Sequence, residues 1–176
     1  AFVFLGGGRT PFKNSATLPL DVSFDLADPR VALVDLNLDG RIDILRHDDG
    51  DGWVWLQRWD GPGFHPAETV PPPPAGLRLG EPGVQLADMD GDRLPDLVRI
   101  LPSERRILVA PSAGFGFFED ATEMIGVPEM SETERWELAD INGDGAADLV
   151  RIGHREVGLW GNQLDGAYAP AGAHDW

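Results

Sequence analysis

The chain has 176 residues, of which 42% are hydrophobic and 25% are charged, and its formal net charge is −16. These proportions are typical of a folded globular domain and not of a disordered chain. The strong negative charge excludes nucleic acid, whose phosphates require a basic face, and disfavours anionic membrane surfaces. Cations are therefore the natural partners. The absence of cysteine excludes disulfides and thiolate metal sites.

Targeting signals are absent from this segment. No apolar run approaches the roughly 18 residues that a membrane span needs. Residues 1–12 lack the basic n-region and the long apolar h-region of a signal peptide. Either a signal has been removed or the segment is internal to a longer chain, and insertion of this segment into a membrane is not expected.

The sequence contains an internal repeat, and its first residues resemble the second half of one repeat unit. The opening stretch FVFLGGGRTPF (2–12) has the pattern of the second half of a unit, and three full units follow it. Each full unit contains an acidic motif. Its three copies are ALVDLNLDGRIDILRH (32–47), ADMDGDRLPDLVRI (87–100) and ELADINGDGAADLVRI (137–152). The first aspartates of the three copies, Asp35, Asp88 and Asp140, are 53 and 52 residues apart. The final HDW (174–176) is similar to ERW (134–136), where the preceding unit begins.

Each unit predicts four short strands. A short apolar strand begins at 54, 107 and 157, and an aromatic residue follows it at Phe64, at Phe117 or Phe118, and at Tyr168. Hairpin sequences lie at 47–52, 102–105 and 153–156, and Pro- and Gly-rich connections such as 71–83 separate the units. In the third unit we expect strands near WELAD, DLVRI, VGLWG and AYAPA.

Four strands repeated at this period are typical of propeller blades. We therefore predict an all-β fold of β-propeller blades, each a four-stranded antiparallel sheet. The expected divisions are a half blade at 1–30 and full blades at 31–83, 84–135 and 136–176.

The acidic loops predict metal sites between the first two strands of each blade. All three fit D-x-[DN]-x-D-[GR]-x-x-D, in which oxygen ligands at positions 1, 3 and 5 and a main-chain carbonyl at position 7 can wrap a hard cation. A carboxylate at position 9 completes each set. Position 12 is arginine in every copy, so these loops are not EF-hands, which require a glutamate there. The candidate ligands are Asp35, Asn37, Asp39, Arg41, Asp43, Asp88, Asp90, Asp92, Leu94, Asp96, Asp140, Asn142, Asp144, Ala146 and Asp148.

Calcium is the expected metal, with about three ions. Asx turns in an acidic protein would explain one such loop, but three copies in register, with every ligand position kept, favour metal binding. Magnesium fits less well because it dehydrates reluctantly. One departure is Arg93 at position 6, where Gly40 and Gly145 allow a sharp turn. We expect Arg93 either to adopt a positive φ or to remodel the second loop.

The combination of these loops with their flanking strands resembles the FG-GAP/VCBS repeats, which also form the propellers of integrin α-chains. More narrowly, DLVRIGHREVGLWGNQLDGAYAP (148–170) resembles repeats in the B subunits of bacterial insecticidal toxin complexes and related Rhs-type virulence toxins. The resemblance implies a calcium-containing β-propeller, secreted by a bacterium, that docks or scaffolds and performs no chemistry.

Other residues offer weaker alternatives. Trp53, Trp55, Trp59 and Trp160 could stack on a sugar, although wedging between blades is the simpler interpretation. The recurring Arg46, Arg99 and Arg151 are expected to pair with neighbouring loop carboxylates. We found no nucleophile elbow, Cys/His pair or phosphate loop, so no catalytic residue is assigned.

Three functions follow from these observations. The first is a non-enzymatic, calcium-binding scaffold that docks a protein partner or neighbouring domains within a larger exported or toxin-type assembly. The second is a lectin-like propeller that binds glycans. The third is a non-catalytic part of a larger enzyme.

Overall fold

The computed structural model describes residues 2–7, 10–17, 25–48, 53–56, 64–164 and 166–170. Side chains are described for residues 25–48, 64–164 and 166–167. Every regular element within the described residues is a β-strand, so the prediction of an all-β fold is confirmed. No helix in this part of the chain is long and apolar enough to cross a membrane.

The described part of the molecule contains three four-stranded antiparallel sheets. We call them the first, second and third blade. The first blade contains, in spatial order, β3 (Val31–Val34), β4 (Asp43–His47), β5 (Trp53–Leu56) and β6 (Glu68–Val70). The second contains β7 (Val84–Ala87), β8 (Asp96–Leu101), β9 (Arg106–Ala110) and β12 (Thr122–Glu123). The third contains β13 (Arg135–Ala139), β14 (Asp148–Ile152), β15 (Val157–Asn162) and β16 (Tyr168–Pro170).

Two further pairs of strands complete the list. At the start of the chain β1 (Phe2–Gly7) pairs with β2 (Thr10–Thr17). Between β9 and β12, a small hairpin contains β10 (Ser112–Gly114) and β11 (Phe117–Phe118).

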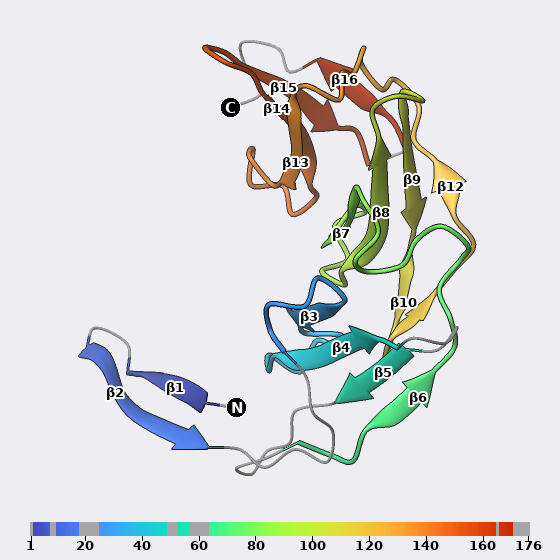
Figure 1. Cartoon of the computed structure of the whole chain (residues 1–176). Helices are drawn as coiled ribbons and strands as arrows, with labels where there is room; N and C mark the ends of the chain where they lie inside the picture. Colours follow the sequence, from blue (N-terminus) through green and yellow to red (C-terminus); the bar gives the residue numbers. More distant parts are fainter. Residues whose placement is uncertain are drawn as a thin grey trace.

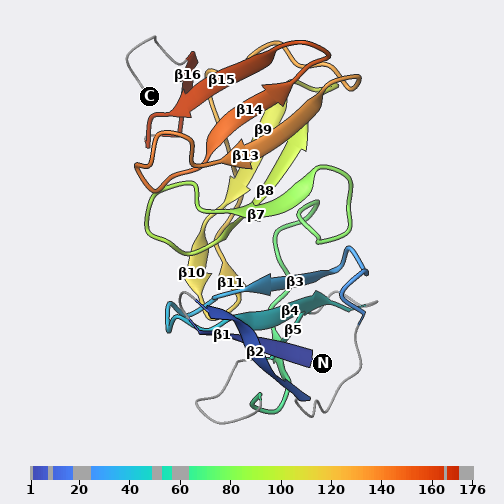
Figure 2. The ribbon, with the colours of Figure 1, turned by 90° about the vertical axis from the view of Figure 1, so that its left-hand side faces the viewer.

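The three blades follow one another along an arc, as Figure 1 shows. The first strands, β3, β7 and β13, lie on the concave side of this arc, and β6 and β12 lie on the convex side. Seen after a quarter turn, the blades are stacked one above another (Figure 2). The arrangement is that of consecutive propeller blades. The residue limits of each blade remain a prediction from the sequence.

The aromatic residue of the second unit lies outside the four-stranded sheet. The sequence pattern placed an aromatic residue, Phe117 or Phe118, after the apolar strand of this unit; both belong to the hairpin β10–β11, and β12 is the outer strand of the sheet. Gly114 and Gly116 adopt positive φ values of 78° and 77° and form the tight turn of this hairpin. β10 and β11 therefore pair with each other, and the chain returns to the blade only at Thr122.

The hydrophobic core lies between the blades. One cluster joins the first and second blades, and its fully buried members are Leu36, Leu45, Leu77, Leu97 and Ala110. A second cluster joins the second and third blades through residues that include Met89, Val98, Ile100, Ile107, Trp136 and Leu149. Because each sheet covers its neighbour, truncating a central residue such as Leu149 to alanine would cost about 2–5 kcal/mol.

Candidate metal loops and the seams between blades

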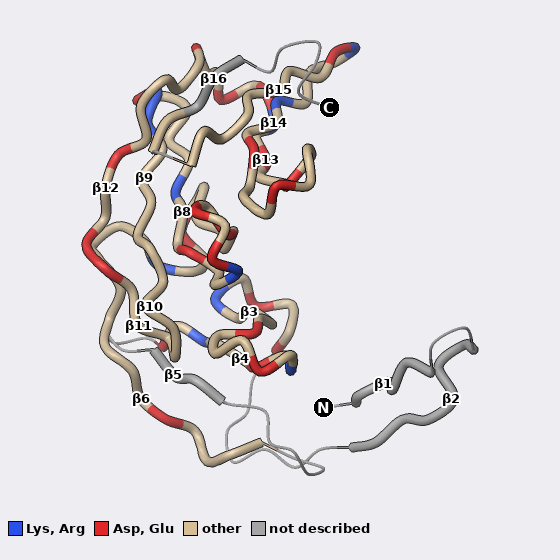
Figure 3. The backbone as a smooth tube through the Cα atoms, turned by 180° about the vertical axis from the view of Figure 1, so that it is seen from behind, with Lys and Arg blue, Asp and Glu red and all other residues tan. Residues whose placement is uncertain are grey.

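The three acidic loops join the first and second strands of their blades. They run from the end of β3 to β4, from β7 to β8 and from β13 to β14. The ninth residue of each motif is the first residue of the second strand: Asp43, Asp96 and Asp148. Figure 3 shows acidic segments recurring along the inner side of the arc, next to β3, β8 and β13.

The first aspartate of each loop organises the turn. In the second loop, Asp88 Oδ1 accepts a hydrogen bond from Gly91 N at 2.8 Å, and Asp88 Oδ2 accepts one from Arg93 N at 2.8 Å. Asp140 Oδ1 and Oδ2 accept the equivalent bonds from Gly143 N and Gly145 N at 2.7 and 3.1 Å. In the first loop, Gly40 N donates to Asp35 Oδ2 at 2.8 Å. Each loop therefore folds around the carboxylate at position 1.

Positions 3 and 5 add a ladder of Asx turns. The residue at position 3 accepts, through Oδ1, the main-chain N–H of position 5 in the pairs Asn37–Asp39, Asp90–Asp92 and Asn142–Asp144, at 3.2, 3.0 and 2.8 Å. The aspartate at position 5 in turn accepts the N–H of position 7, in the pairs Asp39–Arg41, Asp92–Leu94 and Asp144–Ala146, at 2.8, 2.7 and 2.9 Å. These bonds hold the oxygen-bearing side chains on the inside of each turn.

At positions 4 and 6 of each loop, the backbone lies in the left-handed region of φ/ψ space. Position 4 has φ values of 58° at Leu38, 81° at Gly91 and 81° at Gly143. Position 6 has φ values of 79° at Gly40, 75° at Arg93 and 101° at Gly145. Of the two outcomes expected for Arg93, the structure shows the positive φ. The second loop thus keeps the conformation of the other two, and the first loop carries a comparable strain at Leu38.

The ninth aspartate is buried in all three blades. In the second blade, Asp96 Oδ2 accepts the N–H of Met89 at 2.8 Å and Asp96 Oδ1 accepts that of Ser112 at 2.7 Å. In the third, Asp148 accepts the N–H groups of Ile141 and Asn162 at 3.1 and 2.9 Å. In the second and third blades this side chain therefore ties the loop to the start of the second strand and to the chain at or just beyond the end of the third strand, a structural role that the sequence did not indicate.

In the second loop, burial and neighbouring negative charges raise the pKa of two aspartates. Desolvation raises the pKa of Asp96 to about 6, although the hydrogen bonds from Ser112 and Met89 act in the opposite direction. Desolvation also raises the pKa of Asp92, and the nearby carboxylates of Asp90 and Asp88 add to this effect. A cation placed among these groups would favour their charged forms.

The second loop also has the geometry of a cation site. Carboxylate oxygens of Asp88, Asp90 and Asp96 lie within 4.8 Å of one another, and no other set of three acidic or histidine side chains within the described residues meets this condition. The other two loops have asparagine at position 3, so the side-chain oxygen at that position would come from an amide instead of a carboxylate. Aspartate and asparagine oxygens are the ligands that calcium prefers. The residues present therefore fit a calcium ion, which would offset the repulsion among these carboxylates.

Comparison with known proteins identifies the repeat. Residues 35–99 match the model of a family described as FG-GAP-like repeat. Residues 35–99, which contain the first and second acidic loops, therefore carry an FG-GAP-like repeat. No curated protein matches the chain.

Solved structures share the fold of these FG-GAP-like blades. The Photorhabdus luminescens Tc holotoxin pore aligns with a TM-score of 0.67 and 22% identity, over 86% of this chain and 7% of that one. A TcdB2-TccC3-TEV structure aligns at 0.56 and 23%, over 72% and 6%. An Agrocybe aegerita lectin, described as recognising non-reducing terminal N-acetylglucosamine, aligns at 0.55 and 21%, over 77% and 35%. The chain thus spans a small part of these relatives' length, and the likeness shows a β-propeller fold.

The first and second acidic loops lie at the seams between blades. Leu36 O in the first loop accepts a hydrogen bond from Phe115 N of the second blade at 2.7 Å. In the second loop, Asp88 O accepts one from Ala147 N of the third blade at 2.7 Å, and Met89 O accepts one from Asn162 Nδ2 at 2.7 Å. The first and second loops are therefore each fixed by their own blade and by the next one.

Asn162 is a residue whose role the sequence analysis missed. It is buried, and its amide nitrogen also reaches Ala147 O at 3.3 Å. Its Oδ1 accepts the N–H of Leu164 at 3.0 Å, just as Ser112 Oγ accepts that of Gly114 at 3.2 Å in the second blade. The available signal was a polar residue at the end of the third strand in the third blade, Asn162, and two residues after it in the second, Ser112.

The recurring arginines form ion pairs with carboxylates of nearby connections and hairpins. Arg99 Nη1 donates to Glu81 Oε2 at 3.0 Å and to Gly76 O at 2.8 Å, both in the connection that precedes β7. Arg151 Nη2 lies 2.7 Å from Glu156 Oε1 in the hairpin, and Arg151 Nη1 lies 3.6 Å from Glu134 Oε1. In the first blade, Arg46 Nη2 lies 3.2 Å from Asp48 Oδ1. These arginines attach the second strand to nearby connections and hairpins.

The four tryptophans singled out in the sequence were expected either to stack on a sugar or to wedge between blades, and of these the structure describes the side chain only at Trp160. Its ring centroid lies 5.8 Å from that of Trp136, and it packs against the cluster between the second and third blades. The guanidinium carbon of Arg151 lies 5.8 Å from the Trp160 ring centroid. This residue is thus part of the seam, as expected for a wedge. Trp53, Trp55 and Trp59 lie outside the residues whose side chains are described.

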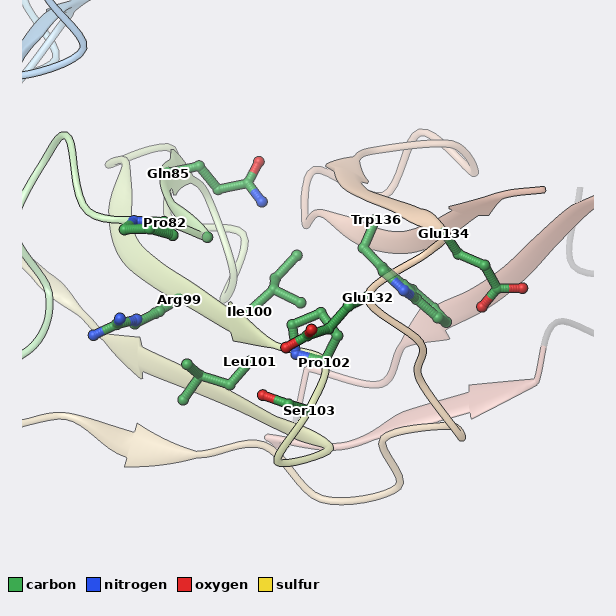
Figure 4. A pocket seen from close by; sticks show the side chains of 11 residues that line it. Pro82, Gln85, Arg99, Ile100, Leu101, Pro102, Ser103, Glu132, Glu134 and Trp136 are labelled. Carbon is green, nitrogen blue, oxygen red and sulfur yellow. The ribbon is translucent and has the colours of Figure 1, made fainter. Parts of the chain in front are cut away.

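A cleft of about 370 Å³ opens between the second and third blades. Figure 4 shows Ile100 and Trp136 on facing sides of it, with Glu132 and Ser103 at its border. Gln85 and Arg99 also line it, so the cleft combines an aromatic edge with several hydrogen-bonding groups.

Proposed function

We propose that the chain is a calcium-binding β-propeller scaffold that docks a protein partner or neighbouring domains within a larger exported assembly. The observation that supports this most directly is the shared hydrogen-bonding frame of the three loops, together with the convergence of Asp88, Asp90 and Asp96 within 4.8 Å. A non-catalytic role agrees with the general use of FG-GAP-like propellers as scaffolds.

About three calcium ions would be bound, one in each loop. Positions 1, 3, 5 and 9 would contribute side-chain oxygens, and position 7 a main-chain carbonyl. The proposed ligands of the second loop are Asp88, Asp90, Asp92, Leu94 and Asp96. The proposed ligands of the other loops are Asp35, Asn37, Asp39, Arg41, Asp43, Asp140, Asn142, Asp144, Ala146 and Asp148. Three divalent ions would offset about six of the net negative charges.

The position of the loops supports a scaffolding role for the metal. Because Asp88 and Met89 also accept hydrogen bonds from the next blade, an ion that stiffens the loop also stiffens the seam. Rigid surfaces lose less entropy when they bind a partner. The inter-blade connections, such as 71–83 and 124–134, would then present a fixed surface for recognition.

The setting of the chain is inferred from its relatives. The Tc structures are toxin assemblies far longer than this chain, which covers 7% and 6% of them. We infer that this segment likewise belongs to a larger, exported bacterial protein. Within it, the blades would be divided at residues 31–83, 84–135 and 136–176, after a half blade at 1–30.

Calorimetric titration with CaCl₂ tests the metal proposal. We expect about three ions with dissociation constants of roughly 10⁻⁴ to 10⁻³ M, as in extracellular modules, and a stabilisation of about 1 kcal/mol per site at low-millimolar calcium. Asp92→Ala should remove about one ion from the stoichiometry, and Asp120→Ala, at an exposed aspartate outside the loops, is its control. Identical melting curves with calcium and with a chelator would refute the proposal.

Crosslinking in the parent assembly tests the docking role. Crosslinks should involve the inter-blade connections, and the calcium-loaded chain should show no glycosidase, esterase or phosphatase activity. Turnover that is abolished by replacing one carboxylate outside the three loops would contradict a scaffold.

Glycan binding is a second candidate, favoured by the cleft between the second and third blades. The cleft places Trp136 near Gln85, Ser103 and Glu132, a mixture suited to a sugar's apolar face and hydroxyl groups. The lectin of the same fold lends this candidate further support. A glycan array would distinguish it. Binding that is lost in Glu132→Gln and Gln85→Ala would support the lectin function, and an array without bound glycans would exclude it.

A further inference from the structure

The seam between the first and second blades is covered by an arginine. Arg30 precedes β3 and lies against Gly80, which precedes β7: a Cβ atom added to Gly80 would lie 2.8 Å from Arg30 Cγ. The guanidinium of Arg30 is held by Asp28, with Nη2 2.7 Å from Oδ2, and 41% of the arginine side chain is exposed. The aliphatic stem of a basic side chain therefore fills this part of the first seam, and its charged head stays near water.

The seam between the second and third blades has no side chain at the equivalent position. Gly83 takes the place of Arg30, because Gly83 O accepts the N–H of Ile100 at 2.9 Å as Arg30 O accepts that of His47 at 2.9 Å. A side chain is excluded there, since Gly83 has a φ of 79° and a Cβ would collide with Ile100 O. Gly83 lines the cleft between these blades, so the cleft is open where Arg30 fills the first seam.

A carboxylate stands on the facing side of this cleft. Glu132 takes the place of Gly80, since each lies eight residues before the first aspartate of the acidic loop in its unit. Its carboxylate makes no hydrogen bond or ion pair within the part of the chain that the structure describes. In Figure 4, Glu132 is directed toward Pro102 on the opposite wall. The second seam thus lacks the basic side chain of the first and has a carboxylate in place of a glycine.

The turn that carries Glu132 is held in place by hydrogen bonds. Glu134 N and the indole Nε1 of Trp136 both donate to Ser131 O, at 3.3 and 3.1 Å. Thr133 N donates to Ser131 Oγ at 3.2 Å. A preorganised segment therefore presents the carboxylate beside Trp136, which reduces the entropy lost on binding.

The other charged residues that line the cleft are already paired. Arg99 points out of the cleft in Figure 4, and its Nη1 lies 3.0 Å from Glu81 Oε2. Glu134 Oε1 lies 3.6 Å from Arg151 Nη1. Glu132 therefore sets the charge of the cleft, and the net charge of −16 carried by the chain further favours a cationic ligand.

From the contrast between the two seams we propose that this cleft binds an arginine side chain of the protein partner. The inference rests on the docking role proposed above and names the chemistry that the partner presents. The aliphatic stem packs between Ile100 and Trp136, and the guanidinium donates to the Glu132 carboxylate. Gln85 and Ser103 supply further acceptors, which suit the forked donors of a guanidinium better than the ammonium of a lysine. A space of about 370 Å³ is small for a binding site and accommodates one such side chain.

NMR titration of the full chain with Nα-acetyl-arginine N-methylamide tests the site. The probe should produce saturable shifts at the indole N–H of Trp136 and at the side-chain amide of Gln85. The citrulline analogue, which has nearly the same shape but no charge, should bind about tenfold more weakly or worse, because a charge-assisted hydrogen bond is lost. Added salt should weaken the binding of the arginine probe.

A pair of matched variants assigns the binding to one carboxylate. Glu132→Gln should raise the dissociation constant of the arginine probe by about tenfold or more, because it removes the charge and keeps the shape. Glu119→Gln, at an exposed carboxylate outside the cleft, is the control and should leave the constant within about twofold. Both glutamates are exposed, so neither substitution should disturb folding.

Three results would overturn the proposal. The first is the absence of saturable shifts with the arginine probe, or equal binding of the citrulline analogue. The second is an equal effect of Glu132→Gln and Glu119→Gln, which would mean that net charge alone attracts the probe. The third is a glycan from the array that shifts these signals when the arginine probe does not, which would assign the cleft to a sugar.

Crosslinking of the parent assembly separates this inference from the docking role on which it rests. Crosslinks at the inter-blade connections without binding of the arginine probe would retain docking and refute the arginine site. Probe binding together with crosslinks that avoid these connections would retain the preference of the cleft for arginine and refute a docked protein partner as its source.

Discussion

Arg93 N donates a hydrogen bond of 2.8 Å to Asp88 Oδ2, and Arg93 makes this contact with a φ of 75°. The equivalent donors are glycines, Gly40 and Gly145. A non-glycine residue in the left-handed region costs roughly 1–2 kcal/mol. The second loop therefore accepts backbone strain in order to keep the frame around its first aspartate.

Arg93→Gly should stabilise the protein by about 1 kcal/mol, because it relieves this strain and keeps the main-chain donor. Urea unfolding in calcium measures the change. Leu38→Gly in the first loop, at a φ of 58°, is a parallel test and should act in the same direction. Loss of stability in Arg93→Gly would reveal a contact of the arginine side chain that outweighs the strain.

Arg41→Leu should strengthen calcium binding at the first loop by a few-fold. Arg41 Nη1 lies 3.1 Å from Asp39 Oδ2, so a cation competes there with a guanidinium. The other loops carry Leu94 and Ala146 at this position. Isothermal titration of the variant measures the change, and Arg105→Leu, which removes an exposed arginine far from the loops, controls for net charge. Equal effects of the two substitutions would mean that only net charge matters.

The calcium-free protein should lose stability as the pH rises from about 4 to about 6. The pKa of Asp96 is raised from 3.8 to about 6 in the folded state, so the folded chain binds this proton more tightly than the unfolded chain does. The contribution of Asp96 is therefore greatest below about pH 4 and is lost as the pH rises through about 6. Thermal melts in chelator measure it, and Asp96→Asn should flatten the profile in this window.

Calcium binding at the second loop should strengthen over the same pH range. The ion binds the deprotonated carboxylate, so protons compete with it until the pH exceeds the Asp96 pKa of about 6. Calcium titrations at pH 5 and pH 7.5 would show this. An affinity that does not vary between these values would exclude Asp96 as a ligand.

Asn162→Leu should destabilise the protein by about 1–3 kcal/mol, because it removes the donor to two buried carbonyls, Met89 O and Ala147 O. Gln163→Leu is the matched control: its side chain is exposed and its change should stay within about 0.5 kcal/mol. Urea unfolding of both variants provides the comparison. Equal costs would indicate that Asn162 does not hold the second and third blades together.

The repeat determined most of what the sequence alone revealed. A strand period of two and an acidic motif recurring at 53 and 52 residues are local properties, so the sheets, the strand order and the loops between first and second strands followed from them. The fifteen candidate ligands came from the same motif. Their local hydrogen bonds, such as Asp92 N to Asp90 Oδ1, join residues two to five positions apart.

Tertiary structure decided what depends on contacts between distant residues. The choice between the two outcomes for Arg93 depended on the folded loop. The burial of Asp96 depends on Ser112, sixteen residues away, and the seam depends on Asn162 reaching Met89 across 73 residues. Likewise, Ile100 and Ile152 occupy equivalent places in nearly identical motifs, yet one is 4% and the other 41% exposed. Only the presence of a neighbouring blade separates them, because burial is a property of what packs against a side chain and not of the side chain itself.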